Sequence, residues 1–456
     1  MADRKIVCIG AGSRYFEDVL AELAVTKELA GTQVMLYDIN AERMATIMKV
    51  GRRILSETEA DLSLDSTADL ARALDGADFA ISSVGVHGFS LEHHKKDCDV
   101  AAKFGIIQTT GDTVGPAGLS QGLRIVPIYL KIARAMEKYC PNVILLQHSN
   151  PMAVICRAVR KYTKINVIGY CHNVINDIRD FASCLGIPES ELEVVIAGPN
   201  HMNWMLSIRH NGKDMYPELI RRMRARKSPR KHIFALETYE MLGIFPIGGD
   251  RHIIEFFPHA RRADKPRNLP YGQTPRSTWI DSYLAKGGHT WKWERLKKRA
   301  AGKLPVAIPT PDKMSPEAMG NQVRAMAYGK PIRQYVNAPN AGAVPNLPDW
   351  AVIELKSVIG SHGARPIFVG ELPAAAARWS LAQIYAHELT ADAAAEFSRE
   401  KAVAALACDP MIRDFREAVQ VFDALVAAHG DWLKPFRKKP GEKRYWPAIP
   451  YRVPID

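Results

Sequence analysis

The sequence predicts an α/β protein with a doubly wound parallel sheet in its N-terminal part and an α+β domain in its C-terminal part. Three observations lead to this fold class. Short apolar runs at 5–9, 77–84 and 141–147 have the pattern of buried strands. Segments with helical patterns separate these runs, and the first run ends in a glycine-rich turn. Alternating strands and helices are typical of a parallel sheet covered on both faces.

The first strand–helix–strand unit predicts a dinucleotide site. The strand at 5–9 leads to a helix at about 15–29 and a strand at 33–37, and the turn between strand and helix is Gly10, Ala11, Gly12 and Ser13. In this Rossmann-like arrangement the glycines let the backbone approach a pyrophosphate at the helix N-terminus. Asp38 follows the second strand and would accept both ribose hydroxyls, which favours NAD over NADP. Tyr15 replaces the third glycine of the motif, which changes helix–strand packing and leaves the phosphate turn intact.

Further strand ends place chemistry-bearing residues at one edge of the predicted sheet. Val84 and Gly85 end the strand at 77–84, and Asn150 comes just after the strand at 141–147. Cys171 and His201 follow two more apolar runs. Because ligands bind at the carboxyl ends of parallel strands, we expect Val84, Gly85 and Asn150 at the cofactor.

The C-terminal half is less regular. A chain of 456 residues is too long for one simple core, and we expect a division near residue 195. Residues 1–195 would bind the cofactor, and residues 196–456 would hold the substrate and form contacts between subunits. The stretch 260–315 predicts a long irregular excursion over the surface, whereas 373–428 predicts helices.

Composition excludes several classes of protein. No run of about 18 apolar residues occurs, so no membrane span is expected, and export is not expected either, because the first residues do not have a charged-then-apolar pattern. Seven cysteines at scattered spacings form no disulfide framework and suit a reducing cytoplasm. The net charge of +12 is concentrated at 221–231 and 434–444, where a solvated surface or recruitment of an anionic substrate would explain it. Nucleic-acid binding is not expected, because no matching motif accompanies the charge.

Two short segments suggest a metal site. Cys171 and His201 each follow an apolar run, with His172 beside the cysteine. A thiolate and imidazoles at neighbouring strand ends would make an open metal site. A buried structural cysteine and a hydrogen-bonded histidine are the alternative interpretation.

Two aspartates are candidates for acid–base chemistry. Asp112 lies in a glycine-rich loop at 109–118, and Asp250 lies beside Arg251 and His252. Asp112 also suits a helix N-cap or a turn, and Asp250 also suits a turn, so the residues alone leave both interpretations open.

Taken together, these segments resemble the family 4 glycoside hydrolases, which depend on NAD and a metal and are related to lactate and malate dehydrogenases. The resemblance spans nearly the whole chain. It is carried by GAGS at 10–13, GDTVGPAG at 111–118, SNPM at 149–152, GYCHN at 169–173, GPNHMNW at 198–204 and YVNAPNAGAVPNLP at 335–348. Residues 260–315 and the tail after 431 match the family poorly.

The resemblance is strongest to the α-galacturonidase-like branch, through the segment 237–258. His172 follows the cysteine, as in members that act on unphosphorylated sugars, whereas phospho-glycosidases have Asp or Asn there. Asn173 departs from the family pattern. The implied substrate is an unphosphorylated α-galacturonide or α-glucuronide, and Arg251 and Arg276 are candidate partners for its carboxylate. Asn150 would also contact the substrate.

The resemblance implies a mechanism of oxidation, elimination, hydration and re-reduction. NAD takes a hydride from carbon 3, and a metal held by Cys171 and His201 stabilises the enolate. Asp250 matches the base that removes the carbon 2 proton, and Asp112 and His172 are candidate acids. Manganese is the implied metal, although a thiolate ligand suits a softer ion such as cobalt.

The family also implies a homodimer or homotetramer. An α-glucosidase or α-galactosidase of the same family is an alternative, and a plain NAD-dependent dehydrogenase of a hydroxy acid or sugar is an alternative from another class.

Overall fold

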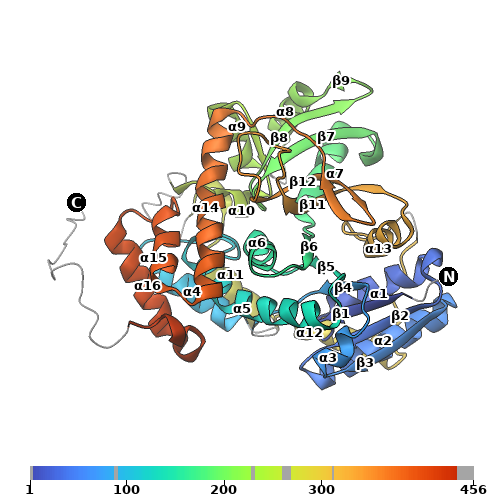
Figure 1. Ribbon diagram of the computed structural model, residues 1–456. Coiled ribbons are helices and arrows are strands. Elements are labelled where there is room, and N and C mark those ends of the chain that lie inside the picture. The colour runs from blue at the N-terminus through green and yellow to red at the C-terminus, as the bar shows by residue number, and fades with distance from the viewer. Residues whose placement is uncertain (1–3, 87–90, 227–231, 259–268, 311–312, 439–456) are drawn as a thin grey trace.

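The computed structural model describes residues 4–86, 91–226, 232–258, 269–310 and 313–438 (Figure 1). Its strands form one sheet in the order β10-β8-β7-β12-β11-β6-β5-β4-β1-β2-β3, with β9 beside β8 and β13 beside β12. The predicted α/β class is confirmed. The basic block at 221–231 is described only to residue 226 and the tail only to residue 438, so the rest of both lies outside the described residues.

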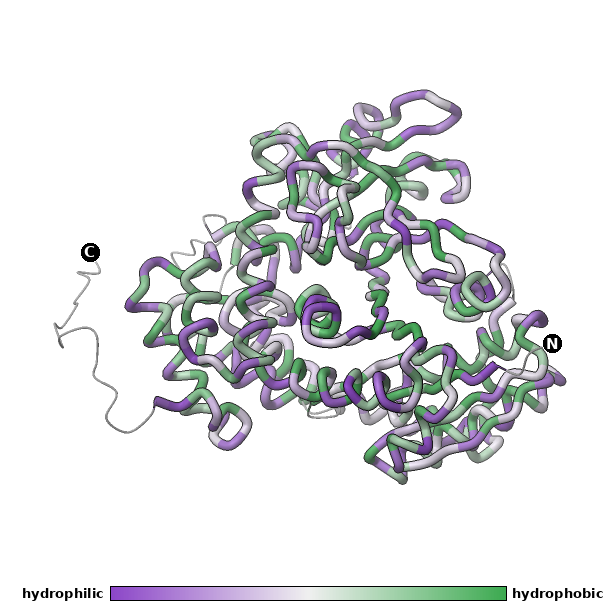
Figure 2. Tube along the Cα trace, in the orientation of Figure 1, coloured by the Kyte–Doolittle hydropathy of each residue, from purple (hydrophilic) through white to green (hydrophobic). Residues whose placement is uncertain are grey.

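The N-terminal half of the sheet is parallel. Its strands are β1 (Lys5–Ile9), β2 (Thr32–Tyr37), β3 (Leu62–Thr67), β4 (Phe79–Ser82), β5 (Ile144–Gln147) and β6 (Asn166–Gly169). Central strands of such a sheet are covered on both faces, so they are almost continuously apolar. β5 and β6 are coloured hydrophobic in Figure 2. The edge strand β3 was not predicted, because its exposed polar residues break the apolar pattern.

The helices of this half are α1 (Tyr15–Val25), α2 (Ala41–Thr58), α3 (Leu70–Leu74), α4 (Glu92–Ala102), α5 (Gly115–Tyr139), α6 (Met152–Tyr162) and α7 (Asn173–Leu185). α1 is shorter than predicted, since residues 27–29 form a separate 3-10 turn. α5 has a proline in its first turn, where a missing N–H costs nothing.

The C-terminal half extends the same sheet with antiparallel strands. These are β7 (Leu192–Gly198), β8 (Asn203–His210), β9 (Lys213–Asp214), β10 (Phe245–Ile247), β11 (Ile332–Pro339), β12 (Val352–Gly360) and β13 (Gly363–Pro366). β11 joins the two halves by pairing with β6 through Asn337 and Gly169. Residue 195, where the sequence suggests a division, lies inside β7. The two proposed domains therefore share one continuous sheet.

The remaining helices are α8 (Tyr216–Ala225), α9 (Ile233–Leu242), α10 (Asp250–Ile253), α11 (Arg276–Ala285), α12 (Thr290–Ala300), α13 (Met319–Tyr328), α14 (Ala374–Glu396), α15 (Arg399–Cys408) and α16 (Phe415–His429). The helices expected at 373–428 are thus present, and α14 packs against α5 and α6 (Figure 1). The prediction of an irregular surface excursion at 260–315 is wrong for its described part. α11 and α12 lie there, although polar residues obscure their periodicity.

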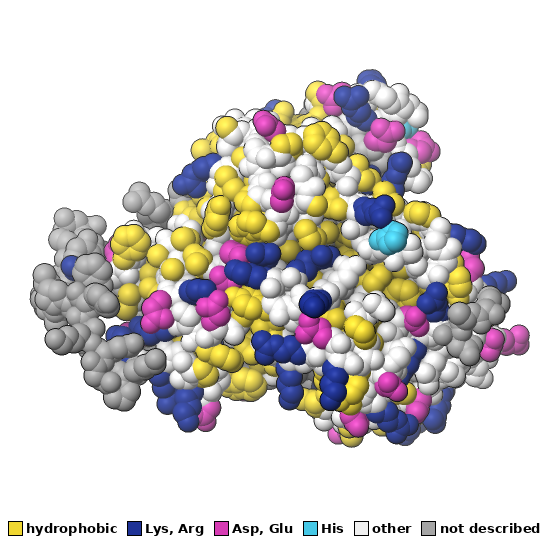
Figure 3. All heavy atoms as spheres, viewed as in Figure 1, with side chains coloured by type: hydrophobic (Ala, Val, Ile, Leu, Met, Phe, Trp, Pro, Cys, Tyr) yellow, Lys and Arg dark blue, Asp and Glu magenta, His cyan; other side chains and the backbone are white. Residues whose placement is uncertain are grey.

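Charged side chains are dispersed over one face of the molecule. On the face shown in Figure 3, Lys and Arg side chains are scattered among Asp and Glu and form no continuous patch. None of the helices in the described ranges is long and apolar enough to cross a membrane.

Candidate active site

A cavity of about 350 Å³ opens at the carboxyl ends of the parallel strands. Its lining comes from the segments after β1, β4, β5 and β6, from the 109–115 loop and from residues 201, 251, 252, 276 and 317 of the C-terminal half. The lining residues are Tyr15, Ser83, Thr110, Asp112, His148, Asn150, Met152, Tyr170, Cys171, His172, Asn173, His201, Arg251, His252, Arg276 and Glu317. The cavity thus unites seven residues that the sequence singled out: Asp112, Asn150, Cys171, His172, His201, Arg251 and Arg276.

Cys171 and His201 have a spacing suited to one metal ion. Cys171 Sγ lies 3.5 Å from His201 Nε2, and both residues are buried. Two ligands bound at about 2.3 Å through sulfur and about 2.1 Å through nitrogen lie about 3.6 Å apart at a tetrahedral angle. The donor pair therefore fits a shared ion without rearrangement.

A third possible ligand was missed by the sequence analysis. Ligand atoms of Asp112, His201 and His252 lie within 4.8 Å of one another. The rings of His201 and His252 are 4.1 Å apart. His252 is two residues beyond Asp250 in the segment Gly248–Glu255, and the local sequence does not show that it reaches His201.

The turn before α10 places His252 against His201. Gly248 has φ +146°, and a Cβ there would overlap the carbonyl group of His201. Only glycine lets these two backbone segments approach so closely. The two histidines therefore meet because the β10–α10 turn begins with glycines.

Polar neighbours orient His201 and Asp112. Thr113 Oγ1 donates to Asp112 Oδ1 at 2.8 Å. It also lies 2.7 Å from His201 Nδ1, and the tautomer of His201 determines which of these two atoms is the donor. Burial alone would lower the pKa of His201, but the sulfur of Cys171 and the carboxylate of Asp112 raise it well above its usual value. A bound divalent cation would replace that proton as the positive charge.

The loop that carries Asp112 is anchored by a buried carboxylate. Glu255 Oε1 accepts hydrogen bonds from the backbone N–H groups of Thr109, Thr110 and Gly111 at 2.6, 2.7 and 3.0 Å. Glu255 is 1% exposed. Gly111, at φ +69°, adopts the left-handed conformation that lets three successive N–H groups converge.

A second polar group lines the same cavity. His172 Nδ1 is 3.4 Å from Glu317 Oε1, and Tyr15 Oη lies 3.0 Å from the His148 ring. Burial lowers the pKa of His148 to about 4, so this ring is neutral near neutrality. Tyr15, which replaces the third glycine of the turn, thus projects into the cavity. The sequence did not predict that Tyr15 or Glu317 would line the cavity.

Two arginines line the same cavity. The guanidinium of Arg276 lies 4.4 Å from the ring of Trp279, and that of Arg251 lies 5.6 Å from it. Arg251 also donates to the Thr109 carbonyl at 3.2 Å. Within the described ranges neither arginine forms an ion pair, and Arg276 Nε is buried without a hydrogen-bond partner. Such a pair suits an anionic ligand.

The structure does not bring Asp250 into this group. Its carboxylate accepts the backbone N–H groups of Phe234 and Ala235 at 3.0 and 3.1 Å and so caps α9. Asp250 is not among the residues that line the cavity. This structural role, which the sequence did not predict, accounts for the aspartate, and its placement outside the cavity speaks against the role of base.

The glycine turn has the shape expected for a dinucleotide. The N–H groups of Gly10 and Ala11 both donate to the Tyr37 carbonyl at 3.0 Å. Gly10 has φ +80°, and a Cβ there would overlap the Ser83 carbonyl. Asp38 Oδ2 accepts from Gly12 N at 2.7 Å, which ties the predicted ribose carboxylate to the turn.

The other predicted cofactor residues follow β1, β4 and β5. Ser13 Oγ accepts from Ser83 Oγ at 3.3 Å, and Val84 N donates to Ser149 Oγ at 2.9 Å. Asn150 donates to Asp112 Oδ2 at 3.1 Å, while its own Oδ1 is buried with no partner within the described part of the chain. This acceptor at the cavity wall is available for a ligand hydroxyl or amide. Gly85 directly follows Val84.

Two family models cover most of the chain. Residues 5–187 match the family 4 glycosyl hydrolase model, and residues 196–412 match the model of the C-terminal domain of the same family. The chain belongs to family 4 of the glycosyl hydrolases. The resemblance stated from the motifs is thereby confirmed.

Relatives of this glycosyl hydrolase carry several substrate names. An α-galacturonidase of Bacillus subtilis is 30% identical, over 92% of this chain and 96% of the relative. An α-galactosidase of the same organism is 29% identical, over 95% of this chain and all of the relative. The family is thus shown, while the names differ in the sugar.

Solved structures agree on the fold. A putative glucosidase of Bacillus subtilis superposes with a TM-score of 0.81 at 27% identity, covering 93% of this chain and 99% of that one. A 6-phospho-α-glucosidase from gut microorganisms, solved with NAD and Mn²⁺, has a TM-score of 0.79 at 24% identity, covering 94% of this chain and 99% of that one. The malate dehydrogenase of Plasmodium falciparum, with a TM-score of 0.51 at 13% identity over 86% of this chain and 99% of that one, shares the fold.

Proposed function

We propose that this glycosyl hydrolase uses NAD and Mn²⁺ to cleave an unphosphorylated uronide, an α-galacturonide or α-glucuronide. The observation that supports the uronide is the pair Arg251 and Arg276 at the cavity, stacked on Trp279 and without a carboxylate partner in the described ranges. A sugar carboxylate would supply that partner. The relative at 30% identity is an α-galacturonidase, which supports the same class.

Each cofactor has residues suited to it. Cys171 and His201 would hold the metal, with Asp112 and His252 close by. The turn at 10–13 and Asp38 would hold the dinucleotide. When bound, NAD supplies reversible hydride transfer at carbon 3 of the sugar, and Mn²⁺ supplies Lewis acidity toward its oxygens.

The two candidate acid–base residues, Asp112 and His172, differ in their exposure to solvent. The Asp112 side chain is 20% exposed and lies beside His201, deep in the cavity. The His172 side chain is 60% exposed and lies against the buried carboxylate of Glu317. We assign proton removal at carbon 2 to Asp112 and proton delivery to the departing aglycone to His172, because the aglycone leaves through the open side. This assignment replaces Asp250, whose carboxylate caps α9.

The deciding experiment is substrate profiling. The enzyme, with NAD, Mn²⁺ and a reductant, should release nitrophenol from p-nitrophenyl α-galacturonide or α-glucuronide. Exchange of the carbon 2 proton into deuterated water should accompany turnover. Release from the α-galactoside or α-glucoside alone would reject the uronide while leaving the family intact. Net NADH accumulation without a metal requirement would instead favour a plain dehydrogenase.

An arginine variant tests the carboxylate contact. Arg276→Lys keeps the charge and loses the planar fork, so KM for the uronide should rise about tenfold or more. Arg295→Lys on the exposed face of α12 is the matched control and should leave KM unchanged. If both variants have the same KM, the proposed contact between Arg276 and the substrate carboxylate is rejected.

Two further parts of the proposal concern the oligomeric state and the cellular compartment. We propose a homodimer or homotetramer, which sedimentation analysis would test. We also propose a reducing, cytoplasmic setting, because all seven cysteines are unpaired and Cys171 must stay reduced to bind metal.

A further inference from the structure

His201 lies in the turn between β7 and β8, and its backbone conformation is unusual. Met202 N donates to the Pro199 carbonyl at 2.9 Å, so residues 199–202 form a turn with His201 in the third position. His201 has φ +70°, in the left-handed region. Turns with a positive φ at this position normally have glycine or asparagine there, because a Cβ is disfavoured in this conformation. The conformation of this proposed metal ligand therefore depends on the contacts that surround the turn.

The carboxylate of Glu354 is bonded to both sides of this turn. Glu354 Oε2 accepts hydrogen bonds from Asn200 Nδ2 and Asn203 Nδ2, each at 2.9 Å. Asn200 directly precedes His201, and Asn203 follows it by two residues. Glu354, Asn200 and Asn203 are fully buried. Because no solvent competes for these hydrogen bonds, they fix the turn more firmly than exposed ones would.

Glu354 also lies between the two strands that lead to the proposed ligands. On β12 it pairs with Gly198, the last residue of β7, and with Asn337 of β11. Asn337 pairs in turn with Gly169, the last residue of β6. The row of these residues crosses the sheet from two residues before the metal-site cysteine to three residues before the histidine. Glu354 is therefore placed where it can set the position of the histidine turn relative to the cysteine.

Packing of the strand does not explain a carboxylate at this position. Glu354 forms no ion pair within the described residues, and its Oε1 is buried without a hydrogen-bond partner there. A buried carboxylate supported only by amides is costly in free energy, and an apolar side chain would pack in the sheet without that cost. The two hydrogen bonds to the turn are what distinguish Glu354 from such a side chain.

We propose that Glu354 is a positioning residue for the metal, because its two hydrogen bonds hold the 199–202 turn and thereby keep His201 at the spacing from Cys171 that one ion needs. The inference rests on the proposed role of Cys171 and His201 as metal ligands. Their Sγ and Nε2 atoms lie 3.5 Å apart. Without the two hydrogen bonds the turn is free to relax from its left-handed conformation, the imidazole loses its alignment with the sulfur, and metal affinity falls.

Metal titration of the whole enzyme tests the proposal, with the electron paramagnetic resonance signal of free Mn²⁺ as the readout. Glu354→Leu removes the acceptor, so the Kd for Mn²⁺ should rise about 10- to 100-fold, as is typical for residues that orient a metal ligand. Glu354→Gln keeps an acceptor oxygen for both amides and should retain the wild-type affinity. Ser357→Ala is the matched control on the same strand, because Ser357 is buried and its hydroxyl has no hydrogen-bond partner in the described ranges. It should leave the Kd unchanged.

A second variant decides the question if Glu354→Leu does not fold. Asn200→Ala removes one of the two hydrogen bonds and leaves β12 unaltered, so the Kd for Mn²⁺ should rise about tenfold.

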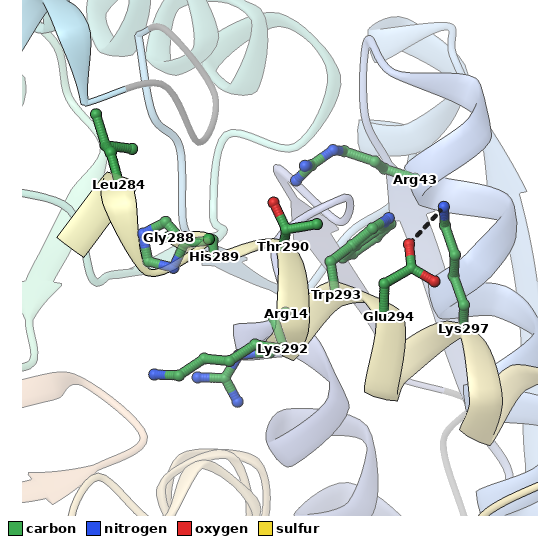
Figure 4. Close-up of a pocket in the computed structure, with 11 residues that line it drawn as sticks. Arg14, Arg43, Leu284, Gly288, His289, Thr290, Lys292, Trp293, Glu294 and Lys297 are labelled. Atoms are coloured by element: carbon green, nitrogen blue, oxygen red, sulfur yellow. Dashed lines mark hydrogen bonds and ion pairs between the residues drawn. The ribbon is translucent and has the colours of Figure 1, made fainter.

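Binding of NAD without metal shows whether the rest of the protein is intact. A second cavity, of about 450 Å³, lies beside the glycine turn and is lined by Arg14 and by residues of α2, α11, α12 and the segment between the last two helices (Figure 4). Glu354 and Asn200 belong to none of these elements. The affinity for NAD should therefore be the same in all of these variants and in the wild type.

The outcomes separate the inference from the ligand assignment. His201→Ala should bind Mn²⁺ more weakly than any other variant. If it does, while Glu354→Leu and Asn200→Ala bind Mn²⁺ like the wild type, the inference alone is overturned. A loss in Glu354→Gln equal to that in Glu354→Leu, or a parallel loss of NAD affinity, would also overturn it. Wild-type Mn²⁺ affinity in His201→Ala would reject the ligand assignment and the inference with it.

Discussion

Replacing Glu255 by Gln should destabilise the protein and impair the site at once. The carboxylate accepts three backbone hydrogen bonds from the 109–111 segment, and it is buried. A bond to a charged group contributes about 1 kcal/mol more than one to a neutral group, so Gln should cost about 3 kcal/mol. For a chain of 456 residues this corresponds to a fall in Tm of about 3 °C.

The same substitution should reduce turnover, because Asp112 directly follows the anchored segment. A displacement of about 1 Å in a positioned group costs about 100-fold in rate, so kcat should fall about 10- to 100-fold. Thermal unfolding and steady-state kinetics measure the two effects. Glu240→Gln is the control, since Glu240 pairs with Arg224 on the exposed surface and should change Tm little. If Glu255→Gln matches the wild type in Tm and kcat, the anchoring argument is refuted.

Three further substitutions test other parts of the structure. Thr113→Val removes the hydroxyl beside His201 Nδ1 and should weaken Mn²⁺ binding about 10- to 100-fold, while wild-type affinity by metal titration would contradict this. Gly10→Ala should abolish NAD binding or folding, because its Cβ would overlap the backbone carbonyl after β4; a folded variant with normal NAD affinity would disprove the argument. Asp97 is buried with Arg124 at 2.6 Å, and although burial raises its pKa, hydrogen bonds from His429 and Arg124 hold the pKa at about 2. Its folded pKa is depressed, so its stabilising contribution is present above pH 4 and is lost as pH falls toward 2. Asp97→Asn should lower the free energy of unfolding by about 3–5 kcal/mol at pH 7. Urea titrations of variant and wild type at pH 7 and near pH 2 should show that this difference in unfolding free energy shrinks in acid.

Local rules were sufficient where chain neighbours determine the structure. The buried strands β1, β4 and β5, the glycine turn and Asp38 were predicted because a short apolar run and a turn need no distant partner. The Cys171 and His201 pair was also predicted, since both residues follow strand ends that meet at one edge.

Long-range contacts explain what was missed. His252 reaches His201 only because the β10–α10 turn packs on the 201 backbone, and Glu317 lies near His172 only through the tertiary fold. Asp250 had two local interpretations of equal standing. The position of α9 decided between them, because the N–H groups at its start meet the carboxylate.

The sequence by itself determined the family and the α/β class. It also placed the glycine turn and the pair Cys171 and His201 at strand ends, because strand ends and glycine conformations are encoded locally. The tertiary structure decided which side chains share a cavity. It removed Asp250 from the site and added His252, Tyr15 and Glu317. It also turned the stretch at 276–300 from an expected surface excursion into two helices that reach both cavities. The physical reason is that such contacts depend on packing between segments that are not neighbours in the chain, which no local pattern records.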